Sequence, residues 1–121
     1  MGLKERRERE KEARKGQILT AARSLLFEKG IQATSINQIA RKAELGVGTI
    51  YFYYQSKEEI FYWLQEEGLD ILFKSIDAIG REDIQPDEKL RRTGGAYLQF
   101  SDEHKDYFDI INYFLATPTV I

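Results

Sequence analysis

The sequence has no cysteine, a single histidine and two prolines among its 121 residues. The lack of cysteine excludes disulfide bonds, thiolate nucleophiles and zinc sites built on sulfur, and it fits a reducing compartment, so we expect a cytoplasmic protein. No apolar run approaches the ~18 residues that a membrane span needs. The histidine, His104, stands among charged residues with no second imidazole, and we expect it on the surface in a first helical turn. Neither a metal, a cofactor nor an enzymatic activity is therefore expected.

The net charge of −2 hides an asymmetry between the two halves of the chain. Residues 1–57 carry twelve Lys and Arg against six Glu, a net +6, whereas residues 58–121 carry six Lys and Arg against fourteen Asp and Glu, a net −8. A basic half joined to an acidic half predicts that the first half meets a polyanion. The mixed run KERREREKEARK is by itself typical of a solvated charged face, because its glutamates offset most of its Arg and Lys.

Every local signal is helical, and no segment alternates convincingly with a period of two. Ser35 with Gln38, and Ser56 with Glu59, form capping-box patterns that predict the starts of a second and a fourth helix. Gly30 is placed to end the first helix. The expected helices are the charged N-terminal run to residue 30, then 35–43, 46 or 47 to 54, 56–80, 86–101 and 102–116. The predicted fold class is all-α.

The second and third helices are short and are separated by a turn of about three residues, which is the pattern of a helix-turn-helix. In the third helix, Ile50 and Tyr54 are four residues apart and are expected to pack inward together. Tyr51, Phe52 and Tyr53 would then face outward. Tyrosine offers an apolar ring to sugars and thymine methyl groups and a hydroxyl to phosphate, so this surface suits double-stranded DNA.

Residues Ile18 to Phe61 resemble the N-terminal domain of the TetR family of bacterial transcriptional regulators. The resemblance rests on AA…LF…G in the first helix, T…IA in the second, GTIY in the third and SKEE at the fourth. It implies a three-helix DNA-binding domain over 1–56, then a long connecting helix and part of a helical ligand-binding and dimerisation domain over 57–121. The sequence departs from the family at Glu44, usually a turn glycine, at Gly46, usually a Ser or Thr cap, and at Tyr54, usually Phe.

The family resemblance also implies roles for individual residues. Those matching base-contacting positions are Val47, Gly48, Thr49 and Phe52, and those matching phosphate-contacting positions are Tyr51, Tyr53 and Lys57; the start of the second helix, at Ile36 and Asn37, also approaches DNA. Independently, a cation in the first turn of a helix is disfavoured by the helix dipole. A nearby phosphate would compensate for Lys57.

Aromatic residues of the second half are candidates for lining a cavity for a small-molecule effector, since such pockets are mostly apolar. The candidates are Trp63, Tyr97, Phe100, Tyr107 and Phe108. Aromatic side chains at helical spacing also arise from ordinary core packing, and that alternative stays open.

The function expected from these features is a DNA-binding transcriptional regulator, a repressor released by a small-molecule effector, which binds a palindromic operator as a homodimer. Two alternatives remain: a helical sensing or protein-interaction module without operator binding, which Glu44 and the missing cap at Gly46 would favour, and an architectural DNA-binding protein. The sequence stops at FLATPTVI, an apolar run with no charged closing turn. We therefore expect a truncated regulator whose dimerisation helices are missing.

Overall fold

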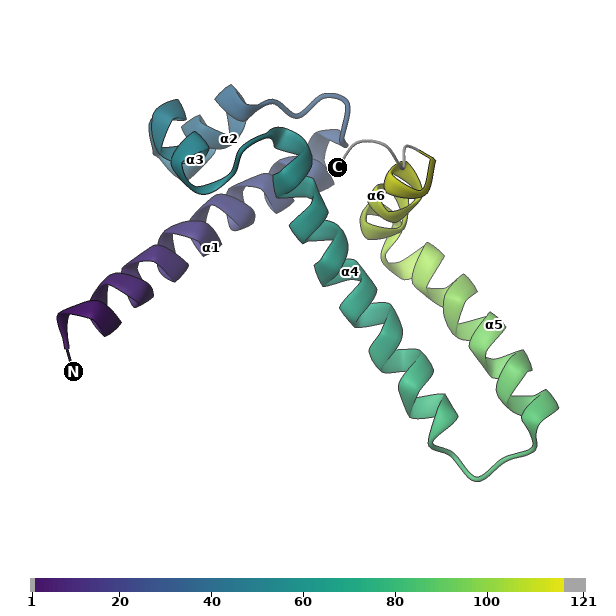
Figure 1. The fold of residues 1–121 in the computed structure, drawn as a ribbon. Helices are drawn as coiled ribbons and strands as arrows, with labels where there is room; N and C mark the ends of the chain where they lie inside the picture. The colour runs from purple at the N-terminus through teal and green to yellow at the C-terminus, as the bar shows by residue number, and fades with distance from the viewer. Residues whose placement is uncertain (1, 117–121) are drawn as a thin grey trace. The chain divides into compact units, whose positions relative to one another are not determined.

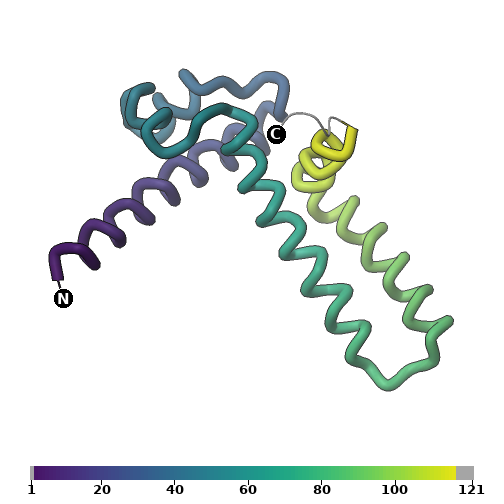
Figure 2. Tube along the Cα trace, viewed as in Figure 1, coloured from purple at the N-terminus to yellow at the C-terminus, as the bar shows by residue number. Residues whose placement is uncertain are grey.

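The computed structural model describes residues 2–116, which form six α-helices and, within that range, no strand (Figures 1 and 2). The all-α prediction is confirmed. The helices are α1 Leu3–Lys29, α2 Ile36–Ala43, α3 Val47–Tyr53, α4 Lys57–Gly80, α5 Pro86–Glu103 and α6 Lys105–Ala116. The closing residues 117–121, which include most of the apolar run noted above, lie outside the described residues.

The chain divides into two compact units, one ending at Trp63 and the other beginning at Leu64. Helix α4 belongs to both, because its first two turns bury Ile60 and Phe61 in the first unit. In the first unit α1 packs on α2 and α2 packs on α3. Fully buried side chains of this unit include those of Ile18, Leu26 and Ile39.

The loop between α1 and α2 is held by local hydrogen bonds. Gly30 ends α1 with φ of 83°, a left-handed conformation that favours glycine. The buried Thr34 hydroxyl donates to the Gly30 carbonyl at 2.8 Å. Ser35 and Gln38 then form the predicted capping box, in which the Gln38 amide donates to Ser35 Oγ at 3.2 Å and the Ser35 amide donates to Gln38 Oε1 at 2.9 Å. The start of α2 is thereby fixed by its own sequence.

The turn between α2 and α3 places Glu44 in the left-handed region, with φ 59° and ψ 41°. It is the only residue other than glycine with a positive φ among residues 2–116. The amide of Leu45 donates to the Ala40 carbonyl at 2.9 Å, and Gln17 Nε2 of α1 donates to the Ala43 carbonyl at 2.7 Å. The turn therefore forms without a glycine, and the left-handed conformation of a side-chain-bearing residue costs about 1–2 kcal/mol.

Replacing Glu44 by glycine is expected to stabilise the protein. The substitution removes the left-handed strain but adds chain entropy to the unfolded state, so the net gain is about 0.5–1 kcal/mol, or a few degrees in Tm. Thermal unfolding followed by circular dichroism measures it. Glu44→Ala is the control, because it removes the same charge and keeps the strain. An equal gain from both substitutions would show that charge rather than backbone strain is responsible.

The start of α4 differs in detail from the predicted capping box. The amide of Glu59 donates to Ser56 Oγ at 3.1 Å, as expected. Glu59 does not reach back to the Ser56 amide, however; its Oε2 accepts from the amide of Gln55 at 2.7 Å. The Glu59 carboxylate therefore accepts from the amide of the residue that precedes the Ser56 cap. The extended backbone after α3 brings this Gln55 amide close to the carboxylate.

The second unit has a small core in which α5 and α6 meet part of α4. Leu72, Phe100 and Tyr107 form its buried cluster. A methyl group built on Gly68 would lie 2.9 Å from Tyr107 Cβ, so the lack of a side chain at Gly68 permits this close packing. The Tyr107 hydroxyl donates to Glu67 Oε2 at 3.0 Å. The aromatic ring and its polar atom are thus both accommodated within this unit.

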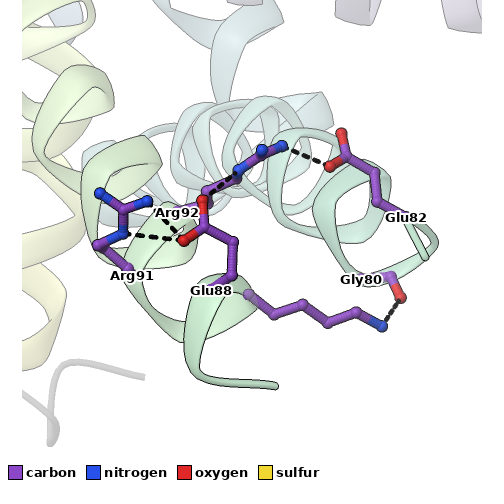
Figure 3. A network of polar contacts seen from close by, with 6 residues as sticks. Gly80, Glu82, Glu88, Arg91 and Arg92 are labelled. Atoms are coloured by element: carbon purple, nitrogen blue, oxygen red, sulfur yellow. Dashed lines mark hydrogen bonds and ion pairs between the residues drawn. The ribbon is translucent and has the colours of Figure 1, made fainter. Parts of the chain in front are cut away.

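Ion pairs join α5 to the start of the preceding loop (Figure 3). Glu88 accepts from Arg91 Nε and from Arg92 Nε, each at 3.0 Å, and Arg92 Nη1 also donates to Glu82 at 2.6 Å. These hydrogen bonds, first from Arg91 and then from Arg92, lower the pKa of the Glu88 carboxyl. The ionised Glu88 carboxylate therefore stabilises the fold at pH values above its unfolded-state pKa, and this stabilisation is lost as the pH falls through its folded-state pKa. The stabilisation is small because water screens these surface ion pairs.

The boundary between α5 and α6 was predicted two to three residues too early. Helix α5 continues through Glu103, and His104 follows its last turn rather than lying in the first turn of α6. The imidazole is half-buried, with ring centroids 5.4 Å from Phe100 and 6.4 Å from Tyr107. The prediction of a solvated His104 is therefore wrong, because two aromatic rings that sequence spacing does not place there shield it.

Candidate nucleic-acid interface

Helix α3 buries only one narrow face. Ile50 and Tyr54, the predicted inward pair, are 0% and 1% exposed. Ile50 is the only residue within Val47–Tyr53 that is buried. Tyr54 follows directly in extended backbone, and its amide donates to the Ile50 carbonyl at 2.9 Å. The remaining side chains of α3 are therefore available to a partner.

The opposite side of α3 is an unusually apolar exposed surface. Phe52 is 80% exposed, Tyr51 51% and Val47 37%, while Thr49 and Tyr53 are half-buried. The rings of Phe52 and Tyr53 meet edge to face, with centroids 4.9 Å apart. We call this surface, made by Val47, Gly48, Thr49, Tyr51, Phe52 and Tyr53, the α3 face.

The beginning of α3 has no side-chain cap. Gly46 occupies the N-cap position, and its carbonyl accepts from the amides of Thr49 at 3.1 Å and Ile50 at 3.3 Å. A methyl group built on Gly46 or Gly48 would meet open space, with no packing neighbour within 4 Å. The two glycines are therefore not required by packing within the described chain, which leaves close approach of a partner's backbone as a reason for them.

Tyr54 links the end of α3 to α1. Its hydroxyl donates to the carbonyl of Lys15 at 3.4 Å, and the Lys15 ammonium lies over its ring, 5.6 Å from the centroid. The hydroxyl that distinguishes Tyr54 from the phenylalanine usual in the family therefore has a partner. No local pattern in the sequence indicates that partner, because it lies 39 residues away.

Lys57 also has a partner within the chain. It is half-buried, and its ammonium lies 5.9 Å from the centroid of Phe61. This cation–π contact offsets part of the unfavourable position of a cation in a first helical turn. This intramolecular contact was not predicted from the sequence, and the expected phosphate contact of Lys57 stays a prediction.

The start of α2 presents two further candidate residues. Asn37 is exposed and Ile36 is half-buried, both in the first turn after the Ser35 cap. Together with the α3 face they belong to the helix-turn-helix that the sequence predicted, and all nine candidate DNA-contacting residues lie in the first unit.

The structure places four of the five candidate ligand-binding aromatics in the second unit, where Phe108 packs against the cluster of Phe100 and Tyr107 and its ring also meets Tyr97. Trp63 lies in the first unit, exposed, with its ring against Tyr62. Tyr107 packs in the core of the second unit, and the rings of Tyr97 and Phe108 stack edge to face at 5.8 Å. Only Phe100 lines the groove of about 240 Å³ between α4 and α5. Side-chain packing accounts for most of this aromatic content.

Two other classes of site are absent from the part of the chain that the structure describes. Within residues 2–116, no three His, Asp or Glu side chains are grouped so that they could hold a metal ion. No helix in the same range is long and apolar enough to cross a membrane.

The sequence model of the family "Bacterial regulatory proteins, tetR family" matches residues 18–62, which contain α2, α3 and the packed part of α1. Among curated proteins, the HTH-type transcriptional regulator HbdR of Aromatoleum sp. (strain CIB) is 34% identical over 95 residues. The alignment covers 78% of this chain and 42% of HbdR. The uncharacterised HTH-type transcriptional regulator YxbF of Bacillus subtilis (strain 168) is 31% identical over 101 residues. That alignment covers 83% of this chain and 27% of YxbF.

Solved structures are similar over a comparable portion. A TetR-like transcriptional regulator from Rhodococcus sp. RHA1 is 30% identical with a TM-score of 0.64, over 81% of this chain and 54% of its own. The TetR-family regulator PfmR of Thermus thermophilus is 29% identical with a TM-score of 0.63. The match covers 83% of this chain and 54% of the PfmR chain. The chain thus spans about half the length of these structures, and less than half of HbdR. Residues 18–62 thus match the TetR family of bacterial regulatory proteins, and the chain is similar in sequence and structure to regulators of that family.

Proposed function

We propose that this chain is the DNA-binding part of a transcriptional repressor, in which the α3 face enters the major groove of an operator. The observation that carries the proposal is the contrast within α3. One residue, Ile50, is buried, while Phe52 is 80% exposed in a chain whose first 57 residues carry a net charge of +6. Exposed aromatic rings are costly in water, and a partner that covers them offsets that cost.

The proposal divides the candidate residues by chemistry. Val47, Thr49 and Phe52 are short or apolar side chains suited to base edges and thymine methyl groups, and Lys57 and the Tyr53 hydroxyl suit phosphate oxygens. Gly48, exposed on the same turn as Thr49, lets the backbone approach the duplex. Tyr51 flanks this surface, and Ile36 and Asn37 add the first turn of α2.

We further propose that the intact regulator binds a palindromic operator as a homodimer and is released by a small-molecule effector. Support comes from the family whose model matches residues 18–62 and from α4, which is part of both compact units. A bound effector that altered the second unit would thereby act on the same helix that buries Ile60 and Phe61 beneath the DNA-binding unit.

Selection of binding sites from random duplexes by the 121-residue chain tests the proposal. We expect enrichment of one half-site, and of two half-sites about 34–36 Å or a multiple apart if the chain dimerises. On the selected site, Val47→Ala and Thr49→Ala should change the preference at particular base pairs by about 1–3 kcal/mol, whereas Lys57→Ala should weaken binding to all sequences alike. Thermal unfolding of each variant controls for the lost Lys57–Phe61 contact.

Other outcomes of the same selection would overturn the proposal. Binding without any sequence preference would identify an architectural DNA-binding protein instead. No binding to any duplex would favour the interaction module, for which the strained Glu44 turn and the uncapped α3 are the supporting features.

A further inference from the structure

The N-terminal half of α1 has no role in the core of the first unit. Helix α1 is continuous from Leu3 to Lys29, yet every residue from 3 to 14 is exposed and the first buried one is Ile18. In Figure 1 this half extends beyond α2 and α3. An exposed helical extension gains little stability from packing, so its helical conformation must be stabilised by contacts among its own side chains or by a partner.

The cations of this extension lie along one face of the helix. They recur with alternating spacings of three and four residues, and the same spacing continues into the buried face of α1. The positions are Lys4, Arg7, Lys11 and Arg14, followed by Ile18, Ala21 and Leu25. A heptad spacing drifts by only about 20° per seven residues on a straight helix, so these positions share a face. We call Lys4, Arg7, Lys11 and Arg14 the α1 basic stripe.

The glutamates of the extension lie outside the row of the four cations, on both sides of it. Glu5 and Glu12 lie about 120–140° from the middle of the stripe at about 100° per residue, whereas Glu8 and Glu10 border it on its two sides, three or four residues from its cations. The near balance of charges in the sequence therefore conceals a continuous row of four cations, bordered by Glu8 and Glu10.

The basic stripe is not neutralised by ion pairs within the described chain. Among residues 2–116, no ion pair joins Lys4, Arg7, Lys11 or Arg14 to another residue. Arg7 and Lys11 are four residues apart, and like charges at that spacing repel each other along a helix. A polyanion on this face would relieve that repulsion.

The basic stripe also begins next to the helix-turn-helix. The residue after Arg14 is Lys15, whose carbonyl accepts from Tyr54 and whose ammonium lies over the Tyr54 ring. Tyr54 immediately follows Tyr53 at the end of α3. From Lys4 to Arg14 the stripe extends about 15 Å at about 1.5 Å per residue, equal to about four base pairs at about 3.4 Å.

We infer that the α1 basic stripe binds phosphates of the operator duplex outside the base pairs beneath α3. The inference rests on the proposed DNA-binding function and adds a second contact region to it. The stripe continues the face of α1 that packs into the helix-turn-helix unit, and it carries the charge that phosphate requires. It reads no sequence, so it adds affinity for flanking DNA of any composition.

The test compares two double variants with equal loss of charge from the same helical segment. Arg7→Gln/Lys11→Gln removes two cations of the stripe, and Arg6→Gln/Arg9→Gln removes two cations from other faces of α1. Each is titrated with the selected site in a short duplex that ends at the half-site and in one extended by about ten base pairs on each side. Circular dichroism checks that α1 remains helical in both.

On the long duplex at about 0.1 M salt, the stripe variant is expected to lose at least about tenfold in affinity. Its slope of log K against log salt should become shallower by about 1.8, since each phosphate contact contributes about 0.9. On the short duplex it should bind like the unmodified chain. The control variant should change less than about twofold on both, and Arg7→Lys/Lys11→Arg should restore the long-duplex affinity.

Equal losses from the two glutamine variants would overturn the inference, because total charge would then explain the effect. Unchanged long-duplex binding by the stripe variant would overturn it while leaving the proposed function intact. Failure of the unmodified chain to bind either selected duplex would instead remove the proposed function and this inference together.

Discussion

Raising the salt concentration from about 50 to about 200 mM is expected to weaken binding of the selected duplex by about 150- to 500-fold. Binding that neutralises phosphates with Lys and Arg releases counterions, and log K falls with log salt by about 0.9 for each contact. Lys57 and the α1 basic stripe together supply about four to five such contacts, all within the net +6 of residues 1–57. Fluorescence anisotropy of a labelled duplex at five or more salt concentrations measures the slope.

Matched lysine substitutions separate local contacts from total charge. Lys57→Ala should make the slope shallower by about 1, because one phosphate contact is lost. Lys74→Ala removes the same charge from the second unit, where Lys74 pairs with Asp70 at 2.9 Å, and should leave the slope unchanged. A slope near zero for the unmodified chain would contradict electrostatic binding of DNA altogether.

The helix boundaries of the first unit were predictable because local chemistry sets them. The capping box of Ser35 and the glycine at position 30 act within four residues, and the structure contains both as expected. The inward pair of α3 followed from its spacing of four residues, and both side chains are buried. These features can be predicted because all the residues that determine them lie within a few positions of one another in the sequence.

Features that depend on distant residues could not be predicted in this way. The partners of Lys57 and Tyr54 are set by how α3 and α4 pack, and the aromatic neighbours of His104 are set by where α5 ends. The packing of the candidate ligand-binding aromatics was unpredictable for a related reason. Helical spacing shows that Tyr107 and Phe108 are on α6, but not that Tyr107 faces the core and Phe108 meets Tyr97.

The α1 basic stripe is an intermediate case. Its residues and their spacing are present in the sequence, but the spacing has meaning only if residues 3–29 form one uninterrupted helix, as they do. Gly16 within this segment is a position where a helix could have been broken. Once the helix is continuous, the direction of Ile18 and Leu25 into the core also fixes the direction of the stripe.

Two alanine substitutions two residues apart in α3 are expected to have opposite effects. Ile50→Ala removes a side chain that is 0% exposed and should lower the free energy of unfolding by about 2–5 kcal/mol. Phe52→Ala removes a ring that is 80% exposed and should change stability by no more than about 0.5 kcal/mol. Urea unfolding followed by circular dichroism gives both values.

DNA binding should show the reverse pattern when it is measured well below each variant's unfolding transition. Phe52→Ala should lose about 1–3 kcal/mol of affinity for the selected site, because a base-edge contact disappears while the fold is intact. Ile50→Ala should bind in proportion to its folded fraction, because Ile50 itself faces away from the α3 face. If Phe52→Ala instead lowered stability as much as Ile50→Ala, the exposed ring would be part of the core in solution. The α3 face would then lose the feature that distinguishes it as a binding surface, and the proposed contact with DNA would have to rest on the cations alone.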